Sequence, residues 1–138
     1  MTWESEIENI KTLRKLAIEQ GGQDNVDRQH AKGRLTVRER IEALLDPGSF
    51  HEVGPISGTS ERDKDGQLIS FTPANFILGF GKIKERTCVV SGEDFTVKGG
   101  SPNASGLRKS IYAEHLACLH RVPLIRLHEG GGGSVGGT

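Results

Sequence analysis

The sequence predicts an α/β fold in which glycine-rich turns follow the strands. Residues 76–83 and 87–92 are β-rich runs joined by a short charged segment, a pattern typical of a hairpin. A helical stretch over residues 105–120 then leads into an apolar run at residues 124–127. Strand, helix and strand in this order indicate a βαβ crossover, and ligands of α/β sheets bind in the turns that follow such strands.

Helices are predicted ahead of the sheet. Residues 3–20 carry a moderate apolar stripe opposite a broad charged face, so we expect this helix to pack outside a compact core, for example on a partner subunit. Residues 23–33 are polar and predict a linker or a short loose helix. Residues 37–45 predict a helix that begins with a capping box formed by Thr36 and Glu39. The stripe of the first helix consists of Ile7, Ile10, Leu13, Ala17 and Ile18.

The segment ahead of the β-rich runs is predicted to be mostly irregular. Residues 49–53 predict a short strand, and residues 54–75 predict a long loop with a solvated, charged tip. Gly79 and Gly81, inside the first β-rich run, indicate close approach of another backbone. The helix over residues 105–120 is expected to bury one apolar face, made of Leu107, Ile111, Ala113, Leu116, Ala117 and Leu119.

The composition argues against several classes of function. Lys and Arg total 18, as do Asp and Glu, so the chain does not have the basic excess of a general binder of nucleic acid or anionic membranes. No run approaches the ~18 apolar residues of a membrane span. The acidic N-terminus lacks the features of a signal or transit peptide, so we expect a cytoplasmic location, or the mitochondrial matrix in a eukaryote.

Metal and thiol chemistry are not expected either. Cys88 and Cys118 have no CxxC spacing and predict small, buried thiols in a reducing compartment. His, Cys and carboxylate side chains show no metal-ligand spacing, so no metal is expected. His115 and His120 are interpreted as surface residues or caps near a helix end.

The glycine-rich closing segment, residues 128–138, is either a flexible linker or a ligand site. It lacks the Gly-Lys-Ser/Thr of a nucleotide-binding loop, and no Gly-x-Ser-x-Gly motif supports a serine nucleophile. Glycines can, however, supply main-chain amides. We predict that consecutive N–H groups at Gly130 and Gly131 form an oxyanion hole for an enolate or a tetrahedral oxyanion. No side-chain base is then required, provided that the other substrate supplies one.

Three motifs resemble one enzyme family. Residues 33–50, GRLTVRERIEALLDPGSF, closely resemble the first motif of the carboxyltransferase (β) subunits of biotin-dependent acyl-CoA carboxylases, which include the propionyl-CoA, methylcrotonyl-CoA and geranyl-CoA carboxylases. Residues 91–101, SGEDFTVKGGS, resemble the second motif, and residues 122–127 with the following glycines resemble the third. The order and the spacing match over nearly the whole chain.

The resemblance implies a crotonase-like (ClpP/crotonase) ββα superhelix, present here as an incomplete N-terminal part with preceding helices. Residues 1–32 are then an N-terminal helix and linker. Residues 33–138 are the front part of the N-terminal acyl-CoA carboxyltransferase domain, cut in the active-site glycine loop and inactive by itself. The implied reaction moves the carboxyl group from carboxybiotin to the α-carbon of an acyl-CoA. The implied partners are a biotin carboxylase/biotin carrier (α) subunit and further β subunits in a homo-oligomer.

The resemblance also implies site residues. The family usually has Asp-Ser-Gly-Gly-Ala-Arg where this chain has residues 128–133, so only the Gly-Gly pair is kept. That pair, Gly130 and Gly131, is the candidate catalytic oxyanion hole for the CoA thioester enolate that attacks CO2. The turn that lies against CoA in the family matches Lys98, Gly99, Gly100 and Ser101. Arg34, Arg38 and Lys109 are candidates for contacts with CoA phosphates or, alternatively, solvated or salt-bridged surface residues.

Two other functions stay open from the sequence. A crotonase-fold hydratase, isomerase or decarboxylase would share the oxyanion hole, but it needs a carboxylate nearby, and Glu129 is the local candidate. A non-catalytic assembly fragment would use the first helix as its docking element. The identity of the acyl chain, and which of the family's two oxyanion holes serves biotin, are also left open.

Overall fold

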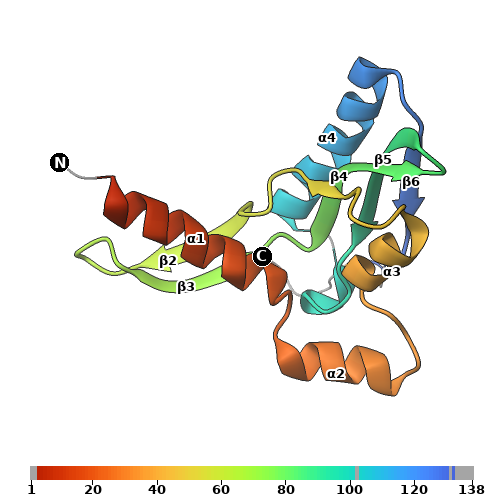
Figure 1. The fold of residues 1–138 in the computed structure, drawn as a ribbon. Helices are drawn as coiled ribbons and strands as arrows, with labels where there is room; N and C mark the ends of the chain where they lie inside the picture. Colours follow the sequence, from red (N-terminus) through yellow and green to blue (C-terminus); the bar gives the residue numbers. More distant parts are fainter. Residues whose placement is uncertain (1–2, 102, 131, 133–138) are drawn as a thin grey trace.

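A four-stranded sheet lies between two helices at the centre of the molecule. The computed structural model describes residues 3–101, 103–130 and 132. The sheet has the strand order β1-β4-β5-β6, and a separate hairpin, β2-β3, projects to one side beside α1 (Figure 1). In chain order the elements are α1 (Glu4–Ile18), α2 (Gln23–Ala31), α3 (Val37–Leu44), β1 (His51–Glu52), β2 (Gly58–Arg62), β3 (Leu68–Pro73), β4 (Phe76–Ile83), β5 (Arg86–Glu93), the 3-10 turn η1 (Lys98–Gly100), α4 (Ala104–His120) and β6 (Leu124–Leu127).

Alternating side chains on the central strands form two separate cores. Ile77 and Val90 face α3, where they pack with Ile41. Their neighbours Leu78 and Val89 point to the opposite face and pack against α4. This two-residue period, with apolar residues on both faces, is expected for a strand pair that is covered on both sides.

The predicted crossover is confirmed. β4 and β5 form an antiparallel hairpin, and β5 then pairs in parallel with β6 after the chain returns through α4. Asn103 begins α4 by accepting a hydrogen bond from Gly106 N at 2.7 Å. The capping box of α3 is also confirmed: Glu39 N donates to the Thr36 hydroxyl, and Thr36 N donates to the Glu39 carboxylate. The start of the glycine-rich segment therefore lies beside the carboxyl end of β5.

The prediction of a loop over residues 54–75 is wrong for most of the segment, although its charged tip is exposed as predicted. β2 and β3 pair as an antiparallel hairpin, and α1 lies along it (Figure 1). The Asp63 carboxylate closes the tip by accepting from Asp65 N at 2.9 Å and Gln67 N at 2.8 Å. Most of the hairpin's side chains are exposed, so its sequence does not show the apolar alternation by which a strand is recognised. Residues 23–33 adopt the helical alternative, as α2.

The buried face of α4 differs from the predicted one. Leu107, Ile111 and Leu119 are 54%, 60% and 64% exposed, whereas Ala113, Leu116 and Ala117 face the sheet as predicted. The helix packs largely through small residues because they allow its backbone to come close to β4 and β5. The position between Gly106 and Ala113 on this inner face is occupied by a lysine, Lys109, which is buried.

The predictions about the cysteines and about the glycines of β4 are confirmed only in part. Cys88 is buried in β5, but Cys118 is exposed on α4, so the prediction of a buried thiol is wrong there. A Cβ at Gly79 would collide with the carbonyl oxygen of His51, which confirms a close backbone approach. At Gly81 the close neighbour is a side chain, that of Leu45. Among the described residues, no helix is long and apolar enough to cross a membrane.

Candidate functional site

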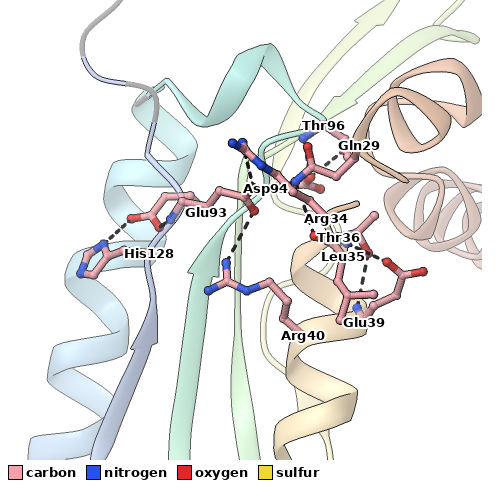
Figure 2. A network of polar contacts seen from close by, with 11 residues as sticks. Gln29, Arg34, Leu35, Thr36, Glu39, Arg40, Glu93, Asp94, Thr96 and His128 are labelled. Atoms are coloured by element: carbon pink, nitrogen blue, oxygen red, sulfur yellow. Dashed lines mark hydrogen bonds and ion pairs between the residues drawn. The ribbon is translucent and has the colours of Figure 1, made fainter. Parts of the chain in front are cut away.

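The carboxyl ends of β5 and β6 meet through the side chain of Glu93, the last residue of β5. Glu93 Oε2 accepts a hydrogen bond from the main-chain N–H of Glu129 at 3.1 Å. Glu93 Oε1 lies 3.1 Å from Nδ1 of His128, whose ring is largely exposed (Figure 2). One carboxylate thus holds two consecutive residues at the start of the glycine-rich segment.

The side chain of Glu129 points away from that segment, toward α2 and α3. Its Oε1 accepts from the side-chain amide of Gln29 at 2.6 Å, and Arg40 lies 3.5 Å from its Oε2. Arg34, a predicted CoA contact, lies 3.9 Å from Oε1, and its own side chain is largely exposed. Because the Glu129 side chain is only 15% exposed, these groups take the place of water around its charge.

The predicted CoA turn packs against the same point of the chain. Lys98, Gly99 and Gly100 have positive φ values of 52°, 62° and 69°, so the chain coils tightly over three residues. A Cβ at Gly100 would lie 3.1 Å from the carbonyl oxygen of Glu129. The carbonyl of Ser101 accepts a hydrogen bond from the side-chain amide of Asn75, which is buried. The structure therefore brings this turn and the start of the glycine-rich segment into contact.

A cavity of about 440 Å³ opens between α2 and this turn. Its cationic lining residues are Arg28, Lys32 and Lys98, and Gly99 also lines it. Within the described part of the chain, no carboxylate lies within salt-bridge distance of these three cations, so their charges are available to a bound anion. We did not identify Arg28 and Lys32 from the sequence. Their spacing of four residues on one helix face is the signal that could have revealed them.

A second pocket is lined by Glu129 itself. It measures about 380 Å³ and is lined by Arg34, Leu35, Arg40, His128 and Glu129. The pocket borders the last residue before Gly130. It therefore lies between the start of the glycine-rich segment and the beginning of the first motif, residues 33–50.

A buried polar network of Asp94, Thr96 and Gly21 lies next to the segment that leads into η1. Asp94, which follows β5, is 1% exposed, and burial raises the pKa of its carboxyl group, while hydrogen bonds from Thr96 act in the opposite direction. Thr96 donates to Asp94 Oδ1 through its main-chain N–H at 3.0 Å and its hydroxyl at 2.6 Å. The Thr96 hydroxyl in turn accepts from Gly21 N at 3.0 Å. This chain of hydrogen bonds ties the α1–α2 turn to the segment that leads to η1.

Lys109 is buried and Arg38 is partly buried, so neither is a freely solvated surface residue. Lys109 is 7% exposed, and burial lowers its pKa to about 8, with Glu52 acting to raise it and Arg38 to lower it further. Arg38 forms a two-pronged ion pair with Glu52, at 2.8 Å and 3.1 Å. The salt-bridged alternative therefore holds for Arg38, and Lys109 is not a solvated surface residue.

The predicted oxyanion hole is described only in part. Gly130 is exposed, and a Cβ there would have no atom within 4 Å. Gly131 lies outside the described residues. Among the described residues, the space beside the α-carbon of Gly130 is thus open.

A comparison with protein families decides what this arrangement belongs to. The family model for the carboxyl transferase domain matches residues 28–137, which is most of the chain. The chain belongs to the carboxyl transferase domain family. The matched range includes the capping-box motif, the η1 turn and the segment after β6.

Relatives of this carboxyl transferase domain cover the chain almost completely, but it spans only about a quarter of their length. A probable biotin-dependent acyl-coenzyme A carboxylase beta2 subunit of Mycobacterium tuberculosis is 36% identical over 97% of this chain and 24% of its own. The mitochondrial propionyl-CoA carboxylase beta chain of Homo sapiens is 34% identical over 93% of this chain and 24% of its own.

Solved structures agree on the crotonase-like fold. The transcarboxylase 12S crystal structure, a hexamer with methylmalonyl-coenzyme A and methylmalonic acid bound, matches with a TM-score of 0.79 and 32% identity. The match covers 98% of this chain and 26% of that chain. A single-chain, multi-domain long-chain acyl-CoA carboxylase matches with a TM-score of 0.76 and 28% identity, over 95% of this chain and 14% of that one.

The carboxyl transferase domain shows no metal-binding group among its described residues. No three His, Cys, Asp or Glu side chains lie close enough together there to hold an ion. The chemical groups that the described site offers are main-chain amides, the cations around two pockets, and the carboxylates of Glu93 and Glu129.

Proposed function

We propose that this chain is part of the carboxyltransferase subunit of a biotin-dependent acyl-CoA carboxylase, which moves a carboxyl group from carboxybiotin to the α-carbon of an acyl-CoA. The observation that carries this proposal is the family match over residues 28–137. In this assignment residues 33–138 are the front part of the N-terminal carboxyltransferase domain, and residues 1–32 are the helix and linker before it. We expect activity to need the remainder of a full-length subunit, since this chain spans about a quarter of the length of its relatives.

The main-chain amides of Gly130 and Gly131 stabilise the thioester enolate. Glycine suits this role because it lets the ligand approach the backbone, as the open surroundings of Gly130 illustrate. Fixed donors of this kind act where charge develops, and losing one typically costs on the order of 2.7–4 kcal/mol in the barrier. The enolate held there attacks CO2.

Coenzyme A binds along the turn formed by Lys98, Gly99, Gly100 and Ser101 and in the cavity beside it, which Lys98 and Gly99 line. The support for this placement is electrostatic: the cavity presents three cations, and coenzyme A carries several phosphate groups. Arg34 lies beyond Glu129 and supplies a further exposed guanidinium. Lys109 is retained as a candidate because a bound anion would favour its protonated form over the neutral form that burial favours.

Biotin and its carrier come from another polypeptide in this proposal. Carboxybiotin supplies the carboxyl group and the base that removes the α-proton, so the chain's own residues need only bind, orient and stabilise. The partner is a biotin carboxylase/biotin carrier subunit, and β subunits associate with one another, as in the transcarboxylase 12S hexamer. We place the assembly in the cytoplasm, or in the mitochondrial matrix if the source is eukaryotic.

The orientation of Glu129 argues against the hydratase, isomerase or decarboxylase alternative. That chemistry needs a carboxylate aimed at the substrate beside the oxyanion hole. The Glu129 carboxylate instead faces Gln29, Arg34 and Arg40 on the far side of the chain. The family match likewise favours a carboxyltransferase over a non-catalytic assembly fragment.

The test uses the full-length subunit with its biotin-carrying partner. Acyl-CoA-dependent decarboxylation of carboxybiotin is measured over a series of acyl chain lengths. We expect turnover with at least one acyl-CoA, and no turnover with any of them would refute the proposal. Gly131→Val is expected to lower kcat by about 10²–10³-fold. Unchanged turnover in that variant would remove the oxyanion-hole assignment and leave the reaction itself standing.

A further inference from the structure

We propose that Glu129 is a positioning residue, and that Gln29 of α2 holds it so that the main-chain N–H of Gly130 points at the thioester oxygen. The inference rests on the proposed function, because it assigns a task to residues outside the oxyanion hole. The starting observation is the hydrogen bond from the Gln29 side-chain amide to Glu129 Oε1, at 2.6 Å between residues 100 positions apart.

The side chain of Gln29 is buried and fixed by hydrogen bonds. It is 3% exposed, although it lies on a helix whose other residues are at least partly exposed. A buried amide is costly unless its hydrogens are bonded. Its Nε2 donates both to Glu129 and, at 3.4 Å, to the carbonyl of Leu35. The two bonds fix the amide plane, and α2 thereby presents one side chain to the start of the glycine-rich segment.

Glu129 is held at three points. Its side chain accepts a hydrogen bond from Gln29, its N–H donates to Glu93, and its carbonyl oxygen lies beside Gly100, where a Cβ would come within 3.1 Å of it. Arg40 adds an ion pair at 3.5 Å (Figure 2 shows Arg40, Gln29 and Glu93 around this point). These contacts come from α2, β5, η1 and α3, so residue 129 is fixed relative to most of the domain.

The geometry of the peptide bond transmits this constraint to Gly130. The carbonyl of Glu129 and the N–H of Gly130 belong to one planar, trans peptide unit and point in opposite directions. Fixing the Glu129 carbonyl therefore fixes the direction of the Gly130 N–H. Glycine has no side chain that could do this itself, so the orientation has to come from the residue before it.

The experiment compares substitutions in the full-length subunit with its biotin-carrying partner. Gln29→Leu removes the donor at similar size, and Glu129→Ala removes the acceptor. We expect each to lower kcat by about 10–100-fold with little change in the KM for acyl-CoA, because a misplaced donor weakens the transition state. The double variant should be no slower than Glu129→Ala alone, because both changes break the same contact.

Two controls separate positioning from general damage. Glu129→Gln keeps an amide oxygen that can accept from Gln29, so it should retain most of kcat. Gln23→Ala removes an exposed amide from the same helix, one that donates to Asp27, and should leave kcat unchanged. Loss of kcat in Glu129→Gln as severe as in Glu129→Ala would overturn the proposal, as would unchanged kcat in Gln29→Leu.

A second readout does not depend on turnover. Hydrogen exchange of peptides that span residues 124–130 should accelerate in Gln29→Leu and not in Gln23→Ala. Unchanged exchange in Gln29→Leu would overturn the proposal even if its kcat fell. If the wild-type assembly lacked carboxyltransferase activity, the proposed function would fail, and the exchange data would still decide whether Gln29 holds the Glu129 backbone.

Discussion

Gly100 lies next to the main-chain carbonyl oxygen of Glu129, so close that a Cβ at position 100 would lie 3.1 Å from that oxygen. The two residues come from segments that we assigned to different tasks, the CoA turn and the approach to the oxyanion hole. Their contact makes the two tasks mechanically dependent. Movement of the turn on ligand binding would therefore displace the Glu129–Gly130 peptide.

The contact predicts that Gly100→Ala lowers both stability and kcat. Alanine at φ +69° carries a left-handed backbone penalty of about 1–2 kcal/mol, and its Cβ would push on the Glu129 carbonyl. We expect a fall of a few degrees in apparent Tm and a kcat reduction larger than the loss of folded protein explains. Thermal melting and steady-state kinetics of the full-length subunit measure the two effects.

Gly66→Ala is the matched control for this prediction. Gly66 has φ +81°, so alanine there carries the same kind of backbone penalty, but a Cβ would have no atom within 4 Å. The control should lose stability and keep kcat. Equal kcat in Gly100→Ala and Gly66→Ala would show that the turn and the glycine-rich segment are not coupled.

We predict that the protein keeps its stability when Asp94 is replaced by asparagine but loses stability when its partner Thr96 is replaced by valine. Asparagine keeps the Oδ1 acceptor for Thr96 and removes a buried charge, so Asp94→Asn should keep or raise the apparent Tm at pH 7. Valine leaves the N–H of Gly21 without its acceptor, at a cost of about 1–3 kcal/mol. A larger loss in Asp94→Asn than in Thr96→Val would contradict this interpretation.

The Asp94 prediction also has a defined pH dependence. Burial raises the folded-state pKa of Asp94 above 3.8, so the folded protein holds this proton more tightly than the unfolded chain. The stability that Asp94 contributes is therefore full below pH 3.8 and declines as the pH rises through the folded-state pKa. The advantage of Asp94→Asn should shrink as the pH is lowered, which melting curves at a series of acidic pH values will reveal.

Lys109→Met is predicted to stabilise the protein at pH 7. The lowered pKa of about 8, against 10.5 for an ordinary lysine, corresponds to a burial cost on the order of 3 kcal/mol for the charged form. Wild-type stability should rise between pH 8 and pH 10.5 as the folded protein sheds this proton before the unfolded chain does, so the advantage of Met should disappear there. The measurement is apparent Tm against pH.

The exposed neighbour Arg108 provides the control for Lys109. Arg108→Met, on the same helix, should change Tm little at any of these pH values. If Lys109→Met did not raise Tm at pH 7, our account of its burial would fail. A raised KM for acyl-CoA in the same variant would support its place in the proposed CoA site.

The cations of the α2 cavity are predicted to bind acyl-CoA through its phosphates. Arg28→Ala combined with Lys32→Ala should raise the KM about tenfold or more and leave kcat nearly unchanged, because the contacts are the same in the ground and transition states. Lys64→Ala, on the exposed hairpin tip, removes a cation far from this cavity in the sequence and should have no effect. An unchanged KM in the double variant would place the phosphates elsewhere.

Local patterns predicted the elements that have a buried side. The β4–β5 hairpin, the α3 capping box and the parallel pairing of β6 with β5 were all predicted, because apolar runs and caps depend on near neighbours in the chain. The β2–β3 hairpin was missed because most of its side chains face solvent. On α4, Leu107 and Leu119 are exposed while Lys109 is buried, because close packing there selects small residues next to the sheet.

The site was predictable to the level of segments but not of contacts. The resemblance assigned residues 98–101 to a CoA turn and Gly130 and Gly131 to an oxyanion hole, and the structure places Gly100 beside Glu129. The hydrogen bond between Gln29 and Glu129 could not be predicted, since the residues are 100 positions apart and neither belongs to a motif that names the other. Tertiary pairing of polar side chains depends on the whole chain path.

The distance along the chain between Gln29 and Glu129 has a consequence for the order of folding. The β4–β5 hairpin closes over a two-residue turn, whereas this contact and that of Gly21 with Thr96 span 100 and 75 positions. Contacts that close long loops carry a larger entropy cost and form after local ones. We expect pulse-labelling hydrogen exchange to protect β4 and β5 first and Glu129 last. The contact that positions the proposed oxyanion hole would then form in the last step of folding.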